Sequence, residues 1–154
     1  MASSASERAI NKAHACGRAL LKFVSANDAG LTGSHQCGFY LPLAVWNMFT
    51  PQEPVDGINH KHSVSVVWQD GRITLSAVTW YGTQTRHEYR LTRFGRDFPF
   101  LNADAVGNLL VLVPESLTRF HGFVLDLEED IDEVQAALGV EVIGTWGIYQ
   151  EGVF

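Results

Sequence analysis

The sequence predicts a mainly β fold with short helices. Most of its apolar segments are too short for typical helices and are rich in β-branched or aromatic residues. Two of these segments are separated by Asp70-Gly71, which is a strong signal for a tight hairpin turn. The 154 residues are the length of one domain and are enough to bury a core without disulfides or metals. We therefore expect a single domain over residues 1–154.

Three short helices are expected. An alanine-rich stretch over residues 6–13 should end at Gly17, because glycine readily adopts the left-handed backbone of a helix end. A second, apolar helix is expected over residues 43–49, between prolines that bound it. The third, over residues 128–138, is acidic and amphipathic, and Gly139 should end it.

The other apolar segments are expected to be strands. They cover residues 18–25, 37–41, 63–68, 72–80, 85–96, 109–113, 120–125 and 140–148. Val64, Val66 and Trp68 lie at alternate positions, as in a strand with one buried face. Residues 57–62 contain two histidines, and we expect a solvated loop there rather than a metal site, because no cysteine or carboxylate pair accompanies them. One interpretation of residues 149–154 is that they begin a linker to a separate domain.

Charge is divided unevenly along the chain. The net charge is −6, but residues 1–96 carry 10 Lys and Arg against 6 Asp and Glu. Residues 97–154 carry 1 against 11, and six of these acids lie within Asp126–Glu133. A polyanion responds to the face that it approaches, within about 10 Å at ordinary salt, more than to the total charge. This distribution is compatible with DNA binding by the first part of the chain.

The sequence argues against membrane insertion and against a disulfide framework. No apolar run approaches the length of a membrane span, and the first residues lack the apolar core of a signal peptide. Cys16 and Cys37 are too few for a disulfide framework. We therefore expect a cytoplasmic protein without membrane contact.

An arginine-rich segment, Thr85–Arg96, is the first candidate for function. It holds four arginines and one carboxylate. On a strand, Arg86, Glu88 and Arg90 would project from one face. Arginine can donate two hydrogen bonds to guanine, and a carboxylate can accept one from the cytosine amino group. The alternative is a solvated strand face whose charges merely pair with each other.

A polar segment, Ser25–Pro42, is the second candidate. Turn-forming residues follow one another closely in it, with many hydrogen-bond donors and acceptors and few aliphatic side chains. Long polar loops in small domains are often functional.

These two segments resemble the N-terminal DNA-binding domain of the EcoRII restriction endonucleases, a type IIE family. The first segment reads SANDAGLTGSHQCGFYLP. It matches the family's Ser-Ala-Asn-Asp, Thr-Gly and His-Gln elements, and then its Gly, Tyr and Pro at Gly38, Tyr40 and Pro42. In the second segment Arg, Glu, Arg, Thr, Arg, Gly and Arg recur at the family's spacings. Ile58-Asn59-His60 echoes a short run between them. Two motifs in the right order are far more specific than one.

The resemblance implies a DNA-binding pseudobarrel like the plant B-three transcription-factor domain. In that fold two arms, one from each segment, clasp the duplex through the major groove. The implied function is that of an effector or regulatory domain of a type II restriction endonuclease that recognises 5′-CC(A/T)GG.

Thirteen residues are predicted to contact DNA. Those predicted to read bases are His35, Tyr40, Arg86, Glu88 and Arg90. Those predicted to contact bases or phosphates are Lys22, Ser25, Asn27, Asp28, Gln36, Tyr89, Arg93 and Arg96. Tyr89 stands where the family has lysine, so a phosphate contact is either missing or replaced by a stacking contact.

No catalytic or metal site is expected. Restriction nucleases often place a lysine two residues after a metal-binding acid. The residues two positions before Lys12, Lys22 and Lys61 are Ile10, Leu20 and Asn59. We expect no cofactor in this domain, with Mg²⁺ confined to a separate catalytic domain. Two alternatives stay open, a self-contained nuclease with an unrecognised active site and a transcription-factor-like DNA-binding module.

The expected partners are double-stranded DNA and a separate nuclease domain of the same polypeptide. We expect the domain to be a monomer in the cytoplasm of a prokaryote.

Overall fold

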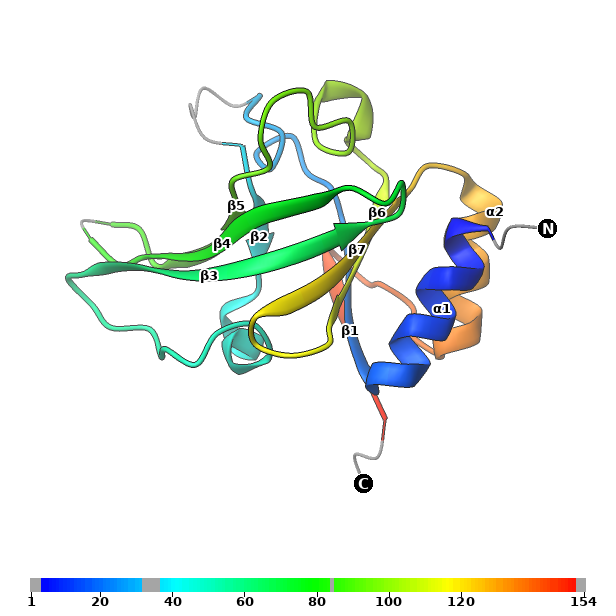
Figure 1. Cartoon of the computed structure of the whole chain (residues 1–154), viewed down its shortest axis with the longest axis horizontal. Helices are drawn as coiled ribbons and strands as arrows, with labels where there is room; N and C mark the ends of the chain where they lie inside the picture. Colours follow the sequence, from blue (N-terminus) through cyan, green and yellow to red (C-terminus); the bar gives the residue numbers. More distant parts are fainter. Residues whose placement is uncertain (1–3, 32–36, 84, 152–154) are drawn as a thin grey trace.

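One eight-stranded sheet forms the body of the molecule. The computed structural model describes residues 4–31, 37–83 and 85–151. The strands are β1 (Arg18–Phe23), β2 (Phe39–Leu41), β3 (Asn59–Trp68), β4 (Ile73–Tyr81), β5 (Glu88–Thr92), β6 (Leu109–Pro114), β7 (Arg119–Leu125) and β8 (Trp146–Gln150). Their order in the sheet is β2-β5-β4-β3-β7-β6-β1-β8. The sheet curls into a half-barrel (Figure 1). The predicted mainly β pseudobarrel is confirmed.

Two α-helices cover one face of this sheet. α1 (Ala5–Cys16) begins where the Ser4 side chain accepts a hydrogen bond from the amide of Glu7 and ends at Gly17, in the left-handed conformation. α2 (Glu128–Leu138) ends in the same way at Gly139. The helices lie side by side at one end of the molecule, and α1 packs against β1, β6 and β7 (Figure 1). Two short 3-10 helices, η1 (Leu43–Met48) and η2 (Ala103–Ala105), complete the fold.

The core has two parts because the central strands are buried on both faces. In β1, Leu20 belongs to a large inner cluster and its neighbour Leu21 to a second cluster beneath the helices. The inner cluster is rich in aromatic rings. The ring of Trp68 stacks on that of Phe100 and meets those of Phe94 and Phe98 edge-on. The rigidity of this inner core fixes the strand ends from which the two polar segments emerge.

A single parallel strand pair joins the two halves of the sheet. β3 and β7 pair in parallel over residues 65–68 and 119–122, whereas all other strand pairs in the described chain are antiparallel. At this seam Gly122 faces the ring of Trp68, and a β-carbon at Gly122 would lie 2.5 Å from that ring. Only glycine fits there without displacing the tryptophan.

Several predicted boundaries were wrong. The arginine-rich strand covers only residues 88–92, because Arg93 and Asp97 take positive φ angles of 68° and 58°, which extended strands do not use. Residues 59–62 belong to β3 rather than to a solvated loop. The last strand covers residues 146–150 rather than 140–148, and it includes two positions of the interpreted linker.

Candidate nucleic-acid interface

The two polar segments lie side by side at one edge of the sheet. We call residues 25–42 the first arm segment and residues 85–96 the second arm segment. β2 in the first pairs with β5 in the second, and Tyr40 stands opposite Arg90. Pairing of β2 with β5 therefore brings together the two stretches that the sequence singled out. His35 and Gln36, predicted to contact DNA, lie outside the described residues.

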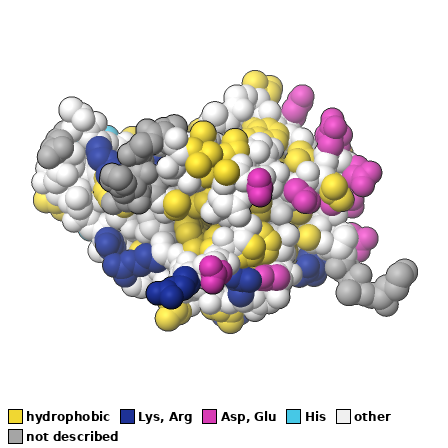
Figure 2. All heavy atoms as spheres, turned by 90° about the horizontal axis from the view of Figure 1, so that it is seen from above, with side chains coloured by type: hydrophobic (Ala, Val, Ile, Leu, Met, Phe, Trp, Pro, Cys, Tyr) yellow, Lys and Arg dark blue, Asp and Glu magenta, His cyan; other side chains and the backbone are white. Residues whose placement is uncertain are grey.

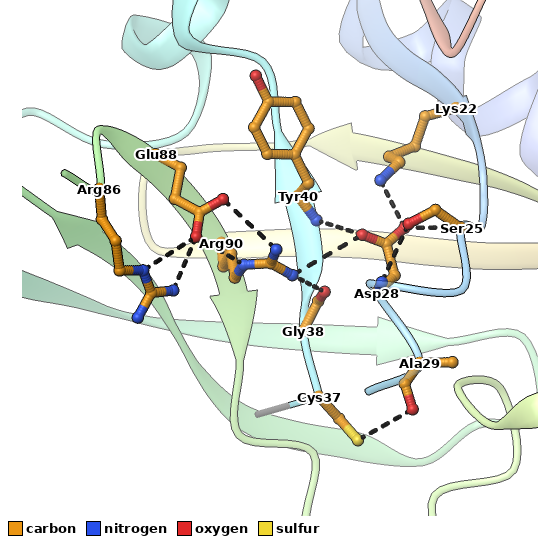
Figure 3. Close-up of polar contacts among 10 residues, drawn as sticks. All are labelled: Lys22, Ser25, Asp28, Ala29, Cys37, Gly38, Tyr40, Arg86, Glu88 and Arg90. Carbon is orange, nitrogen blue, oxygen red and sulfur yellow. Dashed lines mark hydrogen bonds and ion pairs between the residues drawn. The ribbon is translucent and has the colours of Figure 1, made fainter. Parts of the chain in front are cut away.

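Asp28 organises the base of the first arm segment (Figure 3). Its carboxylate accepts hydrogen bonds from Lys22 Nζ at 2.6 Å, from the Ser25 amide at 3.1 Å and from the Tyr40 amide at 3.0 Å. Its own amide donates to Ser25 Oγ, and its carbonyl accepts from the amide of Gly38. The Asp28 side chain has no exposed surface and that of Lys22 is 4% exposed. Burial lowers the pKa of Lys22, and the Asp28 carboxylate opposes that shift.

Arg90 reaches this cluster from the second arm segment. Its Nη1 donates to the carbonyl of Gly38 at 3.0 Å and lies 3.9 Å from Asp28 Oδ1. The other edge of its guanidinium contacts Glu88, with Nε 3.3 Å from Oε1 and Nη2 3.4 Å from Oε2. The arginine is 4% exposed. We call this cluster the arm base; its members are Lys22, Ser25, Asp28, Gly38, Tyr40, Glu88 and Arg90 (Figure 3).

Arg86 and Glu88 form the exposed margin of the arm base. Arg86 donates to Glu88 Oε1 through Nη2 at 2.7 Å and Nε at 3.2 Å, and its guanidinium lies 3.9 Å from the ring centroid of Tyr81. Its side chain is 39% exposed, and that of Glu88 is 23% exposed. Burial by itself would raise the pKa of Glu88, but hydrogen bonds from Arg86 and Arg90 hold the pKa below its ordinary value. The carboxylate is thus kept ionised and able to accept a hydrogen bond.

The prediction that Arg86, Glu88 and Arg90 share a face is confirmed, because Glu88 contacts both arginines. The prediction that all three side chains form an exposed row is wrong. Exposure falls from Arg86 through Glu88 to Arg90, since the first arm segment covers the last of them. The sequence shows which face a side chain occupies, but it does not show that a loop lies over that face.

The structure also corrects the surface position expected of Lys22, Asp28 and Tyr89. Lys22 and Asp28 are buried against each other. Tyr89 is 1% exposed, packs 4.8 Å from the ring of Trp80 and donates its hydroxyl hydrogen bond to the carbonyl of Gln52. Burial raises the pKa of Tyr89 to about 12. Tyr89 is therefore a core residue at the position where the family that the sequence resembles has lysine.

The remaining predicted contacts lie nearer the surface. Asn27, Arg93 and Arg96 are exposed, and Ser25 and Tyr40 are half-buried. Lys22 Nζ lies 5.6 Å from the Tyr40 ring centroid, which places that ring over the buried ion pair. Arg93 and Arg96 lie beyond the end of β5, where the chain turns away from the strand.

Charge is segregated between the two ends of the molecule. On the face shown in Figure 2, most acidic side chains gather at the end where α2 lies, and most of the visible lysines and arginines lie toward the other half. The acidic first turn of α2 suits the positive end of the helix dipole. The acidic helix α2 and the two arm segments therefore lie in different parts of the molecule (Figure 1).

Sequence reasoning missed two residues of the site. The carbonyl of Gly38 accepts from Arg90, and a β-carbon at Gly38 would lie 2.9 Å from the carbonyl oxygen of Leu91, so β2 and β5 approach closely only with glycine there. Tyr81 supports the guanidinium of Arg86. The signal for the first was the glycine itself within a short strand; no signal in the sequence marked the second.

The described residues contain no group of three or more His, Cys, Asp or Glu placed to hold a metal ion. None of the helices in the described chain is long and apolar enough to cross a bilayer.

The chain matches a family model described as "Restriction endonuclease EcoRII, N-terminal" over residues 15–150. The protein belongs to this family. The match spans both arm segments, all eight strands of the sheet, and α2. No curated protein matches the sequence. Membership of the EcoRII N-terminal family supports a DNA-binding effector domain of a restriction endonuclease.

Proposed function

We propose that this EcoRII N-terminal domain binds double-stranded DNA at 5′-CC(A/T)GG, with both arm segments in the major groove, and regulates a type IIE restriction endonuclease. The observation that carries this proposal is the pairing of β2 with β5, which sets two polar segments side by side. In this proposal the cleavage chemistry and its Mg²⁺ belong to a separate nuclease domain of the same polypeptide. The domain acts as a monomer in a prokaryotic cytoplasm.

Arg86 and Glu88 are the residues that we assign to base recognition in the second arm segment. Both are accessible, and two hydrogen bonds from the Arg86 guanidinium to Glu88 Oε1 hold them together. A guanidinium suits guanine O6 and N7, and a neighbouring carboxylate suits the cytosine amino group of the same or the next pair. On binding, the two groups exchange their mutual ion pair for contacts to bases. Because the ion pair has already removed part of the hydration of each group in the free protein, binding costs less desolvation free energy.

Other residues take positioning and phosphate roles in the proposal. His35 and Tyr40 contact bases from the first arm segment. Asn27 and Gln36 of the first arm segment and Arg93 and Arg96 of the second contact bases or phosphates, as their position in the sequence suggested. Arg90 supports Glu88 from behind, because its guanidinium is almost fully buried.

The proposal is tested by a gel-shift titration of the chain with 5′-CC(A/T)GG and with each one-base variant, at fixed salt. We expect each wrong base pair to cost about 1–3 kcal/mol, with affinity falling as salt rises. Equal affinity for all duplexes would contradict sequence-specific binding. The same mixture with Mg²⁺ should leave the DNA intact, and cleavage would support a self-contained nuclease.

A further inference from the structure

We infer that Asp28 is a positioning residue that, with Arg90, latches the two arm segments together so that they engage DNA as one unit. This inference rests on the proposed function for its consequence in DNA binding. The latch itself consists of contacts within the protein.

Asp28 closes the base of the first arm segment. Its carboxylate holds the amides of Ser25 and Tyr40, which lie at the two ends of the segment. Its main-chain carbonyl accepts from the Gly38 amide. A single residue thereby fixes both ends of the loop, and the loop between them has its exit and return points set before DNA arrives.

The same Asp28 carboxylate also links the first arm segment to the body of the half-barrel. Lys22 lies on β1, which is not a sheet neighbour of β2 or β5. Its Nζ is 2.6 Å from Asp28 Oδ2. The Lys22–Asp28 ion pair therefore links β1 to the β2–β5 edge across the open side of the half-barrel, where no strand pairing is present among the described residues.

Arg90 extends this connection into the second arm segment. It holds the Gly38 carbonyl and faces Asp28 with one edge, and it holds Glu88 with the other. Charges therefore alternate in sign from Lys22 through Asp28, Arg90 and Glu88 to Arg86 (Figure 3). The first three side chains are at most 4% exposed, and exposure then rises to 23% at Glu88 and 39% at Arg86.

The burial gradient explains why the two segments should not move independently. A charge that is removed from water must be paired, and withdrawing one partner strands the other. Opening the first arm segment would expose or strand Asp28 and, with it, Lys22 and Arg90. A shift of either segment is therefore transmitted to the other, and a contact made by one segment with DNA orders the second in advance.

The first test needs no DNA. Amide hydrogen exchange, followed by NMR, is compared between the unaltered chain and Asp28→Asn. We expect the Ser25 and Tyr40 amides, and those of β2 and β5, to exchange at least about tenfold faster in the variant, while β6 and β7 stay unchanged. Exchange rates within about twofold of the unaltered chain would overturn the latch. The matched control is Asp132→Asn on the exposed face of α2, which removes the same charge far from the arm base.

The second test measures coupling in DNA binding. Tyr40→Phe and Arg86→Ala are combined in a double-variant cycle with the 5′-CC(A/T)GG duplex. In the chain with Asp28, the combined loss of affinity should differ from the product of the single losses by about tenfold. In the Asp28→Asn background it should equal that product within about twofold. A purely structural role for Asp28 would weaken binding but leave the coupling in place, and that result would overturn the inference.

The two tests also separate this inference from the proposed function. If the unaltered chain shows no preference for 5′-CC(A/T)GG, the proposed function fails, and the exchange rates alone still decide whether the latch exists. If Asp28→Asn does not fold, the double variant Lys22→Met/Asp28→Asn is used, because replacing both members of a buried ion pair is usually tolerated better than stranding one.

Discussion

The arm base and the helix-covered face use opposite means to hold their parts together. In the arm base, Lys22, Asp28 and Arg90 are buried charges joined by ion pairs and hydrogen bonds. Beneath α1 and α2, the second core cluster consists of buried apolar side chains such as Leu21, Val111 and Leu138. Burying apolar side chains stabilises a fold without a cost in desolvation free energy. A buried charge has such a cost, and only complete pairing offsets it. From this contrast we infer that the buried charges of the arm base serve to position the two arm segments rather than to stabilise the fold.

The largest effect is expected from Asp28→Ala. This change strands the Lys22 ammonium and removes one neighbour of the Arg90 guanidinium. We expect a loss of about 3–5 kcal/mol in the free energy of unfolding, measured in urea. Asp132→Ala, on the exposed face of α2, should change it by less than about 0.5 kcal/mol. A comparably small loss for Asp28→Ala would show that the buried pair contributes no more than a surface charge.

The opposite face is probed by Leu138→Ala. This residue is 6% exposed and lies in the cluster beneath the helices, so its truncation should cost about 2–4 kcal/mol of unfolding free energy. Affinity for DNA, measured at a temperature where the variant is folded, should stay within about twofold because the site is remote. A selective loss of cognate affinity would mean that the two regions are coupled after all.

Arg86→Ala sharpens the comparison at the exposed margin of the arm base. We expect it to cost about 1–3 kcal/mol of binding free energy and to relax selectivity at one base pair. Arg96→Ala should weaken cognate and scrambled duplexes alike, with a shallower salt dependence. Equal losses on both duplexes for Arg86→Ala would reject its role in base recognition.

The smallest expected effect is the acid dependence of Glu88. Its pKa in the folded protein is below the ordinary value of 4.5, so its ionised form stabilises the fold above that pH. This contribution is lost as the pH falls through the lowered pKa. The difference in Tm between the unaltered chain and Glu88→Gln should therefore shrink as the pH falls from about 6 to about 3. A difference that does not vary with pH would contradict the Arg86–Glu88–Arg90 pairing.

The sequence predicted which segments form strands better than it predicted where the strands end. It also predicted which segments form the site better than which of their side chains are buried. Alternation and the Asp70-Gly71 turn located β3 and β4 because both signals are local. β5 ends early because Arg93 takes a positive φ. Arginine rarely adopts this conformation, so the residue type gives no indication of the turn.

Burial within the arm base was not predictable from local pattern. Asp28 reads as a surface residue in a polar loop, and only tertiary structure brings it under Arg90. One signal was present nevertheless. Lys22 is the single charge after Arg18 in an otherwise apolar strand, and a charge on a buried strand requires a partner close by. The structure supplies that partner in Asp28, the first carboxylate along the chain after Lys22.

The parallel seam between β3 and β7 bears on how the molecule assembles. Parallel neighbours cannot be joined by a tight turn, and the chain makes the whole excursion through β4, β5 and the β6–β7 hairpin before the two strands meet. Contacts between residues so distant along the chain form late, after the nearby hairpins. Refolding should therefore be limited by the docking of two preformed sub-sheets, at the position where Gly122 admits the ring of Trp68.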